Sequence, residues 1–504
     1  MIMTIKLETE IAIIGSGMGG GMISRALAEK GHKVLILERG SRLPREDRNW
    51  DPSYVFIEGA YKNASTWLDE NGKEFAPGVH YYVGGNTKVY GASLFRFREK
   101  DFEEYQAAEG VSPAWPFKYA DLEPYYSKAE KWLKVHGNVG EDPTEPWRSE
   151  PYPFPAVPHE AYLKKIAEQM ERLGLKPLHM AMGVDRQTNG LCIQCKTCDG
   201  FPCKLGAKSD AETCGVDPAI ATGNATLIEG IEIYKLEHDE TGKTITSAKA
   251  RKNGEEYEIH AKTFILSGGA ANSAALLLKS KSSKYPHGLA NSSGLVGKNW
   301  MVHNATFMVG FDPRRGNDTN FQKTLSVNDW YWESPQGYPL GNIQMLGKLQ
   351  AAMFKASRPW APTWALKYLA NHSIDLYIES EDLPSMENHI SVDADGRIRI
   401  TWKPNNMKAH KGLVKQATRM LRKLGFPVVL TEQMGIETNS HMCGTVVAGN
   451  DPKTSVLNQF CRTHDLSNLY VVDSSFFPSS AAVNPALTIA AQALRVADLG
   501  GISS

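Results

Sequence analysis

A glycine-rich turn between two short apolar segments constrains the fold of this chain more than any other feature. Residues 8–15 (ETEIAIIG) have the composition of a buried strand, and residues 15–31 continue with glycines and then with apolar side chains at helical spacing. Residues 32–40 (HKVLILERG) form a second apolar segment, which contains an acid near its end. This order of strand, glycine turn, helix and strand predicts a βαβ unit in an α/β domain.

The glycines of this turn, Gly15, Gly17 and Gly20, have the spacing G-x-G-x-x-G. The first permits the tight turn, the second lets the backbone approach a pyrophosphate, and the third lets helix and strand pack closely. Glu38 follows about 20 residues later, where a carboxylate can bind ribose hydroxyls. We expect a dinucleotide site, although the fingerprint does not distinguish NAD from FAD. The alternative is a glycine-rich turn in an unrelated α/β domain.

Bulk properties exclude several classes of protein. The 504 residues suffice for two domains, and 56 basic residues balance 56 acidic ones, so no net charge attracts nucleic acid or an anionic membrane. No run of about eighteen apolar residues is present, and MIMTIKLETE lacks the pattern of a secretory signal. We therefore expect no nucleic-acid partner, no direct membrane span and a cytoplasmic location. Export together with a partner that carries a signal is the alternative.

Other segments have simple local patterns. A glycine loop with aromatic residues on both sides (YYVGGNTKVYGASLFRFR) occupies residues 81–98, within a loop-rich part of the chain. Turn signals and apolar runs predict a strand-rich meander over residues 225–269. Apolar periodicity predicts helices over residues 159–175, 272–280, 408–425 and 484–500.

Four of the seven cysteines lie within twelve residues, in the segment CIQCKTCDGFPC, and we call residues 192–203 the cysteine loop. Cys192, Cys195, Cys198 and Cys203 have the spacing C-x2-C-x2-C-x4-C. Four thiolates in one loop suit a tetrahedral metal or an iron–sulfur centre. A redox dithiol or local disulfide and a loop of inert, packed thiols are the alternatives.

The C-terminal stretch 439–499, which contains NSHMCGT and VNPALTIAAQAL, resembles the closing segment of the glucose-methanol-choline (GMC) oxidoreductases. GSGMGGG with Glu38, VGGNTKVYGAS, FILSGGAANSAALLLKS, SGLVGKNWMVH and SEDLPSMENHISVD are similar to further landmarks of that family. The resemblance implies an α/β fold in which a Rossmann-like FAD-binding domain is interleaved with an α+β substrate-binding domain, built from an antiparallel sheet and helices. The implied FAD-binding segments are 1–150, 190–300 and 440–504, and the implied substrate-binding segments are 151–189 and 301–439.

The same resemblance implies the residues that bind FAD. Besides the fingerprint, these residues are in the glycine loop, in YVVDSSFFP and at the start of the last helix: Gly84, Gly85, Asn86, Asp473, Pro485 and Thr488. Some sugar-oxidising relatives carry a histidine in the glycine loop that bonds covalently to the flavin. The matching position here looks like Val89, so we expect non-covalent FAD.

Oxidation of an alcohol by a flavin requires a base for the hydroxyl proton, and histidine is the usual residue. His441, in NSHMCGT, and Asn484, just before Pro485, match the catalytic pair of the family. We expect His441 to take the proton and Asn484 to hold the oxygen. Two alternatives are an NAD-linked dehydrogenase and a non-catalytic FAD or iron–sulfur electron-transfer subunit.

Within the family, the chain looks closest to bacterial sugar and glycoside oxidoreductases. A secondary hydroxyl of a sugar, at C3 in the leading hypothesis, is therefore the expected target, with primary, aryl, choline-like or sterol alcohols as alternatives. Residues 313–370 contain no family landmark, but the aromatic residues of 328–370 suit stacking on a sugar or, alternatively, a core or partner contact. They are Trp330, Tyr331, Trp332, Trp360 and Trp364.

Electrons leave the flavin for O2, a diffusible acceptor or a partner subunit, and the sequence does not decide between an oxidase and a dehydrogenase. In multi-subunit sugar dehydrogenases of this family, a similar cysteine cluster holds an iron–sulfur centre. The spacing here departs from the common ferredoxin run, and no proline follows Cys203. The resemblance therefore implies an iron–sulfur cluster less strongly than it implies FAD.

Overall fold

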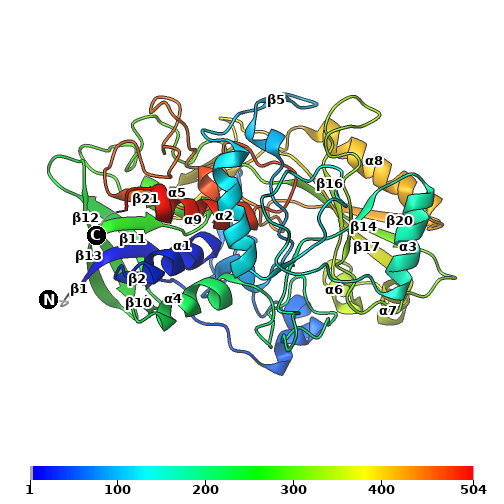
Figure 1. The fold of residues 1–504 in the computed structure, drawn as a ribbon. Helices are drawn as coiled ribbons and strands as arrows, with labels where there is room; N and C mark the ends of the chain where they lie inside the picture. The colour runs from blue at the N-terminus through cyan, green and yellow to red at the C-terminus, as the bar shows by residue number, and fades with distance from the viewer. Residues whose placement is uncertain (1–3, 503–504) are drawn as a thin grey trace.

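A computed structural model describes residues 4–502. A seven-stranded sheet occupies one half of the molecule, on the left in Figure 1. Strand β1 (Ile5–Ile14) lies between β2 (Val34–Leu37) and β13 (Glu255–Leu266), and both pairings are parallel. Strands β12 (Ile245–Lys252) and β11 (Glu232–His238) continue the sheet as an antiparallel meander, whereas β21 (Leu469–Val471) pairs in parallel with β13.

The predicted βαβ unit is present, with α1 (Met18–Glu29) between β1 and β2. The meander predicted over residues 225–269 is correct for β11, β12 and β13 but wrong for its first strand. Strand β10 (Ala225–Ile228) pairs in parallel with β2 at the opposite edge. The reason is that β10 continues the parallel part of the sheet, and its partners are more than 180 residues earlier in the chain.

Helices pack against this sheet at the side of the central cavity. Helix α1 contacts α9 (Ala486–Leu499), which in turn contacts α2 (Tyr119–Trp132). Helix α5 (Ala270–Lys279) follows β13 directly, and the short α4 (Asp217–Ala221) precedes β10. These helices and the sheet share the largest hydrophobic core. This half is the expected Rossmann-like unit.

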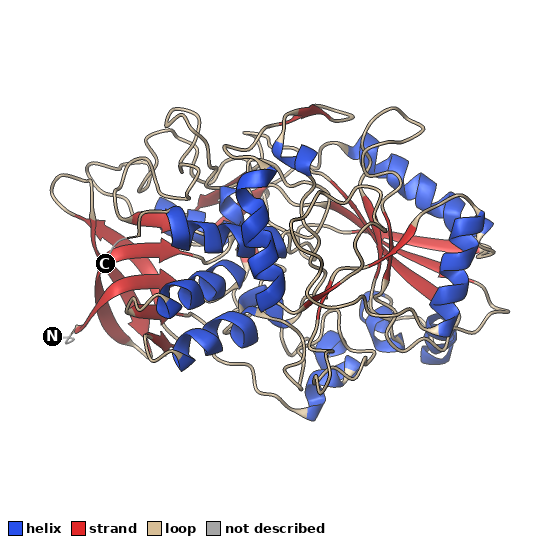
Figure 2. Ribbon diagram, viewed as in Figure 1, coloured by secondary structure: helices blue, strands red, loops and turns tan. Residues whose placement is uncertain are grey.

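The other half is built on a six-stranded antiparallel sheet, seen at the right of Figure 2. Helices α3 (Ala161–Arg172) and α8 (Met407–Lys423) cover one face of it through a shared apolar core. Alternation along the strands turns Phe307 and Tyr377 to the opposite face, toward the cavity, while Met308 and Leu376 join the core. The strand order is β20 (Val428–Gln433), β14 (Asn304–Phe311), β17 (Ser373–Ser380), β16 (Asn342–Met345), β15 (Leu325–Val327) and β8 (Pro177–His179).

A small four-stranded sheet packs against α5. Strand β19 (Ile398–Thr401) pairs with β18 (His389–Val392) and with β3 (Trp67–Leu68), which pairs with β4 (Glu74–Phe75). Ile390, Ile398 and Ile400 pack with alanines of α5. This part of segment 301–439 is thus built against the nucleotide-binding half.

The remaining elements are short. Two helices, α6 (Ala351–Ser357) and α7 (Thr363–Asn371), lie below the six-stranded sheet in Figure 1. Two-stranded pairs join β5 (Tyr105–Gln106) to β6 (Val111–Ser112) and β7 (Val135–His136) to β9 (Met182–Gly183). Within residues 4–502, no helix is both long and apolar enough to cross a bilayer.

Candidate active site

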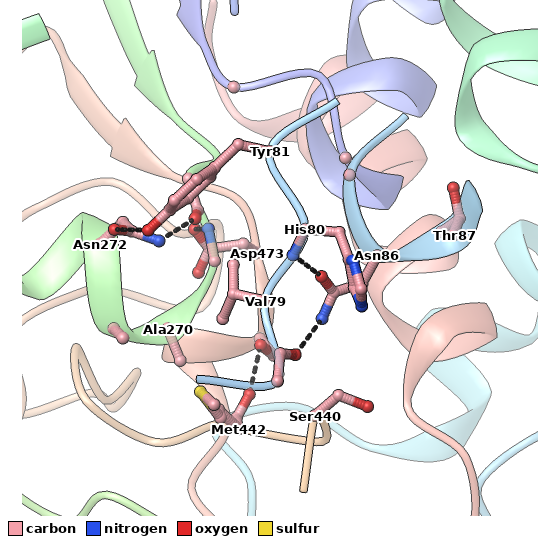
Figure 3. Close-up of a pocket in the computed structure, with 18 of the residues that line it drawn as sticks. Val79, His80, Tyr81, Asn86, Thr87, Ala270, Asn272, Ser440, Met442 and Asp473 are labelled. Carbon is pink, nitrogen blue, oxygen red and sulfur yellow. Dashed lines mark hydrogen bonds between the residues drawn. The ribbon is translucent and has the colours of Figure 1, made fainter. Parts of the chain in front are cut away.

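A cavity of about 870 Å³ lies between the two halves. Its walls contain the glycine turn, the glycine loop, the start of α5 and the segments around His441 and Asn484. Residues from Ile14 to Ile489 contribute, so the cavity is assembled from the whole chain. Figure 3 shows part of its wall, where Tyr81 donates to Asn272 and the segment Val79–Tyr81 lies beside Asn86.

The three fingerprint glycines have different surroundings. A Cβ on Gly15 would lie 2.3 Å from the Ser267 carbonyl oxygen, and a Cβ on Gly20 would lie 2.0 Å from that of Gly15. Gly17 lines the cavity, and a Cβ there would meet nothing within 4 Å. Gly15 and Gly20 therefore permit close packing, whereas Gly17 leaves open space at the N-terminus of α1, as a pyrophosphate cradle requires.

Glu38 lines the same part of the cavity directly after β2. Its carboxylate accepts hydrogen bonds from the Ser16 amide (2.9 Å) and hydroxyl (2.6 Å) and from the Gly40 amide (2.9 Å). Burial raises the pKa of Glu38, and these donors offset part of that shift. The carboxylate is thus fixed on the cavity wall beside the fingerprint turn, and its contact with a ribose stays a prediction.

The glycine loop places Gly85, Asn86 and Val89 on the cavity wall, but Gly84 lies behind it. The Gly84 amide donates to the Ser16 hydroxyl (3.1 Å), which ties this loop to the fingerprint turn. Asn86 is fixed by a bond from the His80 amide to its Oδ1 (2.8 Å), visible in Figure 3. The loop therefore presents backbone and an amide side chain to the cavity.

The C-terminal segment contributes Asp473 and Pro485 to the wall. Asp473 accepts from the Gly269 amide (2.9 Å) and the Ser273 hydroxyl (2.6 Å), and so holds the N-terminus of α5. Thr488 differs from the prediction. It is fully buried, does not line the cavity, and its hydroxyl lies 2.7 Å from that of Tyr126, because it is on the face of α9 that packs on α2.

His441 and Asn484 both line the cavity, and other residues orient them from behind. Glu379 Oε1 lies 2.9 Å from Nδ1 of His441 and 2.9 Å from Nδ1 of His303. Gln344 Nε2 donates to Glu379 Oε2 (2.6 Å) and to Asn484 Oδ1 (3.0 Å). One hydrogen-bond network therefore connects the two predicted catalytic residues.

The partners of His303 define where the protons are. Its Nε2 lies 3.0 Å from the Ser480 carbonyl oxygen, which can only accept, so Nε2 carries a proton. Its Nδ1 lies 2.9 Å from the Glu379 carboxylate and 2.9 Å from Nδ1 of His441, and a proton on His303 Nδ1 suits both contacts. His303 is therefore an imidazolium ion, buried against Glu379.

The pKa shifts agree with this assignment. Burial raises the pKa of Glu379, but His303 and His441 lower it to about 2. Burial lowers the pKa of His303, but the Glu379 carboxylate raises it above its ordinary value. For His441, burial lowers the pKa, and Glu379 offsets only part of the shift. His441 is thus neutral at physiological pH.

These contacts point the reactive atoms into the cavity. Nδ1 of His441 lies 2.9 Å from Glu379 Oε1 and 2.9 Å from Nδ1 of His303. We assign a proton to Nδ1 of His441, donated to Glu379, and in residues 4–502 the other ring nitrogen, Nε2, has no hydrogen-bond partner. Asn484 Oδ1 accepts from Gln344, so its NH2 group is the end left for a ligand. The wall therefore presents a proton acceptor beside a hydrogen-bond donor.

Sequence reasoning missed His303, Glu379 and Gln344. His303 ends the segment SGLVGKNWMVH, and Glu379 is in the segment just before SEDLPSMENHISVD, so both lie near family landmarks. Gln344 lies in a strand without a motif. A buried acid within a run of apolar strand residues was the one available signal for Glu379.

The cysteine loop lies against the glycine loop and reaches the cavity. The Lys208 ammonium donates to the carbonyl oxygens of Tyr90 (2.7 Å), Cys198 (2.8 Å) and Phe201 (2.7 Å). The Gly200 amide donates to Val89 (2.8 Å), and Gly200 itself lines the cavity. The loop is therefore attached directly to the wall that the glycine loop forms.

The cysteines themselves are free thiols. Burial raises the pKa of Cys198 to about 12. Over the described residues, the one group of three candidate metal ligands within 4.8 Å of one another is His303, Glu379 and His441. The four cysteines are thus neither paired in disulfides nor gathered around one point, and metal binding there remains a prediction.

The aromatic residues of segment 328–370 do not line the cavity. Tyr331 is buried and donates to Asp101 (3.0 Å), and Trp330 and Trp332 pack on the cores. Trp360 and Trp364 are 80% and 76% exposed. The structure thus matches the alternative of core filling and outward contact, and Phe307 and Tyr377 are the aromatic residues at the cavity.

A parallel nucleotide-binding sheet that faces an antiparallel sheet, with a neutral histidine on the cavity between them, is the arrangement expected of a flavin-dependent oxidoreductase. Comparison with known families agrees: the N-terminal part of the GMC oxidoreductases matches residues 18–305, and their C-terminal part matches residues 385–493. The chain belongs to the GMC oxidoreductase family. It is an FAD-dependent enzyme that acts on CH–OH groups.

Individual relatives agree over nearly the full length. The chain is 29% identical to 6'''-hydroxyparomomycin C oxidase of Streptomyces lividus, over 96% of this chain and 90% of that protein. It is 25% identical to the fructose dehydrogenase large subunit of Gluconobacter japonicus, over 98% and 97%. The fold is similar to that of pyridoxine 4-oxidase from Mesorbium loti, with a TM-score of 0.65, 16% identity and coverage of 97% and 98%.

Proposed function

We propose that this enzyme oxidises a secondary hydroxyl of a sugar or glycoside, with C3 of a pyranoside as the first position to test. The observation that carries the proposal is the pair of groups on the cavity wall: the unpartnered Nε2 of neutral His441 and the NH2 of Asn484, both fixed through Glu379 and Gln344. Relatives whose names give sugar and aminoglycoside substrates support the substrate class.

The residues divide the reaction between them. Asn484 donates to the substrate oxygen, and His441 Nε2 accepts the hydroxyl proton as the carbonyl forms. The imidazolium so formed is stabilised by Glu379 through Nδ1. FAD, when bound along the open face of Gly17, supplies the hydride acceptor. His441 thus removes the hydroxyl proton, and Asn484 fixes the position of the carbon that is oxidised.

The test is anaerobic reduction of the purified flavoprotein by methyl β-D-glucopyranoside, followed in the visible spectrum. We expect bleaching of the oxidised flavin and, for His441→Ala, an undiminished flavin content with a rate reduced about 10²–10⁴-fold. Asn484→Ala should lose less. A near-normal rate for His441→Ala would remove His441 from the role of base, and a colourless protein that responds only to NAD would contradict the whole proposal.

We further propose that FAD is held without a covalent bond, since the position that matches the histidine of some relatives is Val89, which lines the cavity. Acid precipitation should release all flavin into the supernatant. The cysteine loop is the proposed exit for electrons to an acceptor, because it touches the glycine loop through Gly200 and Lys208. Iron and acid-labile sulfide analysis of anaerobically purified protein tests for a cluster, and full activity without iron would contradict it. The cytoplasmic location stays a prediction.

A further inference from the structure

An ion pair in the cavity wall has no part in the proton transfer described above. Lys323 Nζ lies 2.8 and 2.9 Å from the two carboxylate oxygens of Asp199. The side chains are 5% and 16% exposed, and both line the cavity. An ion pair withdrawn from water gains little net stability, so its place on a ligand cavity calls for another explanation.

The hydrogen bonds of the pair are incomplete. Asp199 Oδ2 also accepts from the Gly347 amide (2.5 Å), but in the part of the chain that the structure describes Oδ1 accepts only from Lys323. The ammonium has three N–H donors, and its hydrogen bonds to described residues are those to Asp199. One donor and one acceptor therefore remain side by side.

The backbone beside the pair has no room for a side chain. A Cβ on Gly91 would lie 1.6 Å from Asp199 Oδ1 and 2.3 Å from Lys323 Nζ. Any other residue at Gly91, in the glycine loop, would therefore displace the pair. Asp199 belongs to the cysteine loop, so two loops with separate motifs meet at this point.

The pair adjoins the part of the wall that carries the base. Asp199 accepts from the Gly347 amide, and the neighbouring Leu346 packs with Phe307 and Tyr377. The His441 ring is 6.3 Å from that of Tyr377, which is 5.7 Å from that of Phe307, and all three line the cavity. The Lys323 charge contributes, after burial, to the lowered pKa of His441. Two aromatic rings and a polar pair surround the space next to the reactive nitrogen, as in a site for a ring with both C–H faces and hydroxyls.

The charges at this end cancel. Lys323 balances Asp199, and the His303 imidazolium balances Glu379. Such a site gives no net attraction to an anionic or a cationic ligand. Paired donors and acceptors instead suit neutral hydroxyl groups, each of which both donates and accepts.

We propose that Asp199 and Lys323 form a subsite that binds two neighbouring hydroxyls of a neutral polyhydroxylated ring. One hydroxyl accepts from the Lys323 ammonium and the next donates to Asp199 Oδ1, while His441 and Asn484 hold the hydroxyl that is oxidised. This inference rests on the proposed function and defines its substrate class as an uncharged vicinal diol. The subsite also gives a role to Asp199, the acid between Cys198 and Gly200 in the cysteine loop.

The test compares two probes of the same ring size. Methyl β-D-glucopyranoside has neighbouring hydroxyls, and cyclohexanol has one. The double variant Asp199→Asn/Lys323→Met removes both charges, so neither is left unpaired. At a pH above the acid limb, where His441 is neutral in both proteins, we expect kcat/KM for the glucoside to fall about 10- to 100-fold through KM, and the loss with cyclohexanol to be much smaller.

The chain offers a matched control in Lys348 and Asp375, a buried ion pair at 2.7 Å that does not line the cavity. Lys348→Met/Asp375→Asn should leave the KM ratio of the two probes at its native value. If it shifts the ratio as much as the Asp199/Lys323 variant does, the effect is general and the subsite is wrong.

Three further outcomes overturn the proposal. Equal losses with both probes would make the pair structural, and tighter binding of glucosamine or glucuronate than of the neutral glucoside would contradict the charge argument. Oxidation of cyclohexanol but not of the glucoside by the native enzyme would reject the subsite while alcohol oxidation stands. Failure to reduce the flavin with any alcohol would instead reject the proposed function itself.

Discussion

His303 and Glu379 act on the base from behind in opposite directions, which a pH profile can separate. The His303 cation lowers the pKa of His441, after burial, and Glu379 raises it. Because the base must be neutral, the rate falls as the pH drops through its pKa. His303→Gln should therefore move the acid limb of kcat/KM to higher pH, and Glu379→Gln should move it to lower pH.

Both variants break a buried pair and should cost about 3–5 kcal/mol of stability, so the profile is measured by flavin reduction below the melting temperature. If the acid limbs of kcat/KM of the two variants move in the same direction, the assigned charges are contradicted. A structural role alone would lower the rate at every pH without moving the limb.

Gly17 and Gly20 give a second paired prediction at the residue scale. A methyl group at Gly17 has room in the folded chain but lies in the space left for the pyrophosphate. Gly17→Ala should therefore fold normally and bind FAD at least about 10-fold more weakly, as measured by flavin fluorescence titration. Gly20→Ala, whose methyl would lie 2.0 Å from a carbonyl oxygen, should instead lower the melting temperature of the protein without FAD. Equal effects would contradict the separate roles.

Residues predicted from a contiguous pattern are ones that the structure places on the cavity wall, while their roles stay predictions. His441, Asn484 and Gly17 each lie in a motif, and each lines the cavity. His303 and Glu379 were missed because their role arises from a contact over 76 residues between neighbouring strands. Lys323 and Asp199 meet over 124 residues, which no local pattern records.

Strand β17 shows how an element can carry polar groups into the core. All of its residues are buried, and the two acids that follow it, Glu381 and Asp382, are buried as well. Burial raises the pKa of each to about 7, although Tyr105 and Ser112 donate to Glu381. These carboxyls are therefore protonated in mildly acidic solution.

The sign of the pH effect follows. A raised pKa in the folded state gives stability that is complete below about pH 4 and is lost as the pH rises through about 7. Glu381→Gln cannot ionise, so its free energy of unfolding should fall by about 3 kcal/mol less than that of the native enzyme between pH 5 and pH 8. Urea unfolding at both pH values measures this difference. Parallel curves for the two proteins would contradict it.

Helices were predicted well where the apolar periodicity of their own residues determines them. Helices α3, α8 and α9 occur where apolar spacing placed them. Helices α3 and α8 bury one face, whereas α9 is buried on all sides from Leu487 to Ala497. The partner of β10 was not predictable, since a strand of four residues does not specify which edge it joins. The exposed Trp360 and Trp364 show that aromatic composition alone does not locate a binding wall.

At the scale of the whole molecule, FAD should stabilise both halves together. The cavity takes residues from each sheet, so a ligand there binds only the assembled chain. Saturating FAD should add about 4 kcal/mol at a thousand times its dissociation constant. Removal of FAD with acid and salt should lower the melting temperature, and added FAD should restore it. An unchanged melting temperature would contradict a ligand held between the halves.

The interleaved two-domain architecture was expected from the family resemblance, and the two sheets confirm its fold class. The small sheet was not predictable from sequence. Strand β19 pairs with β3, which lies over 300 residues earlier, and both β18 and β19 pack on α5. Pairing at such separation is fixed by the folded core and not by local sequence.

Two C-terminal features determine when the cavity can be completed in the cell. They are the parallel pairing of β21 with β13 and the wall formed by Asn484 to Ile489. A ribosome has made the fingerprint turn, the glycine loop and the cysteine loop long before it reaches Leu469. Until the chain is synthesised past Ile489 and clears the exit tunnel, the cavity lacks one side. Loading of the cofactor therefore follows translation of nearly the whole chain, and a nascent chain stalled before Leu469 would leave the ribosome without flavin.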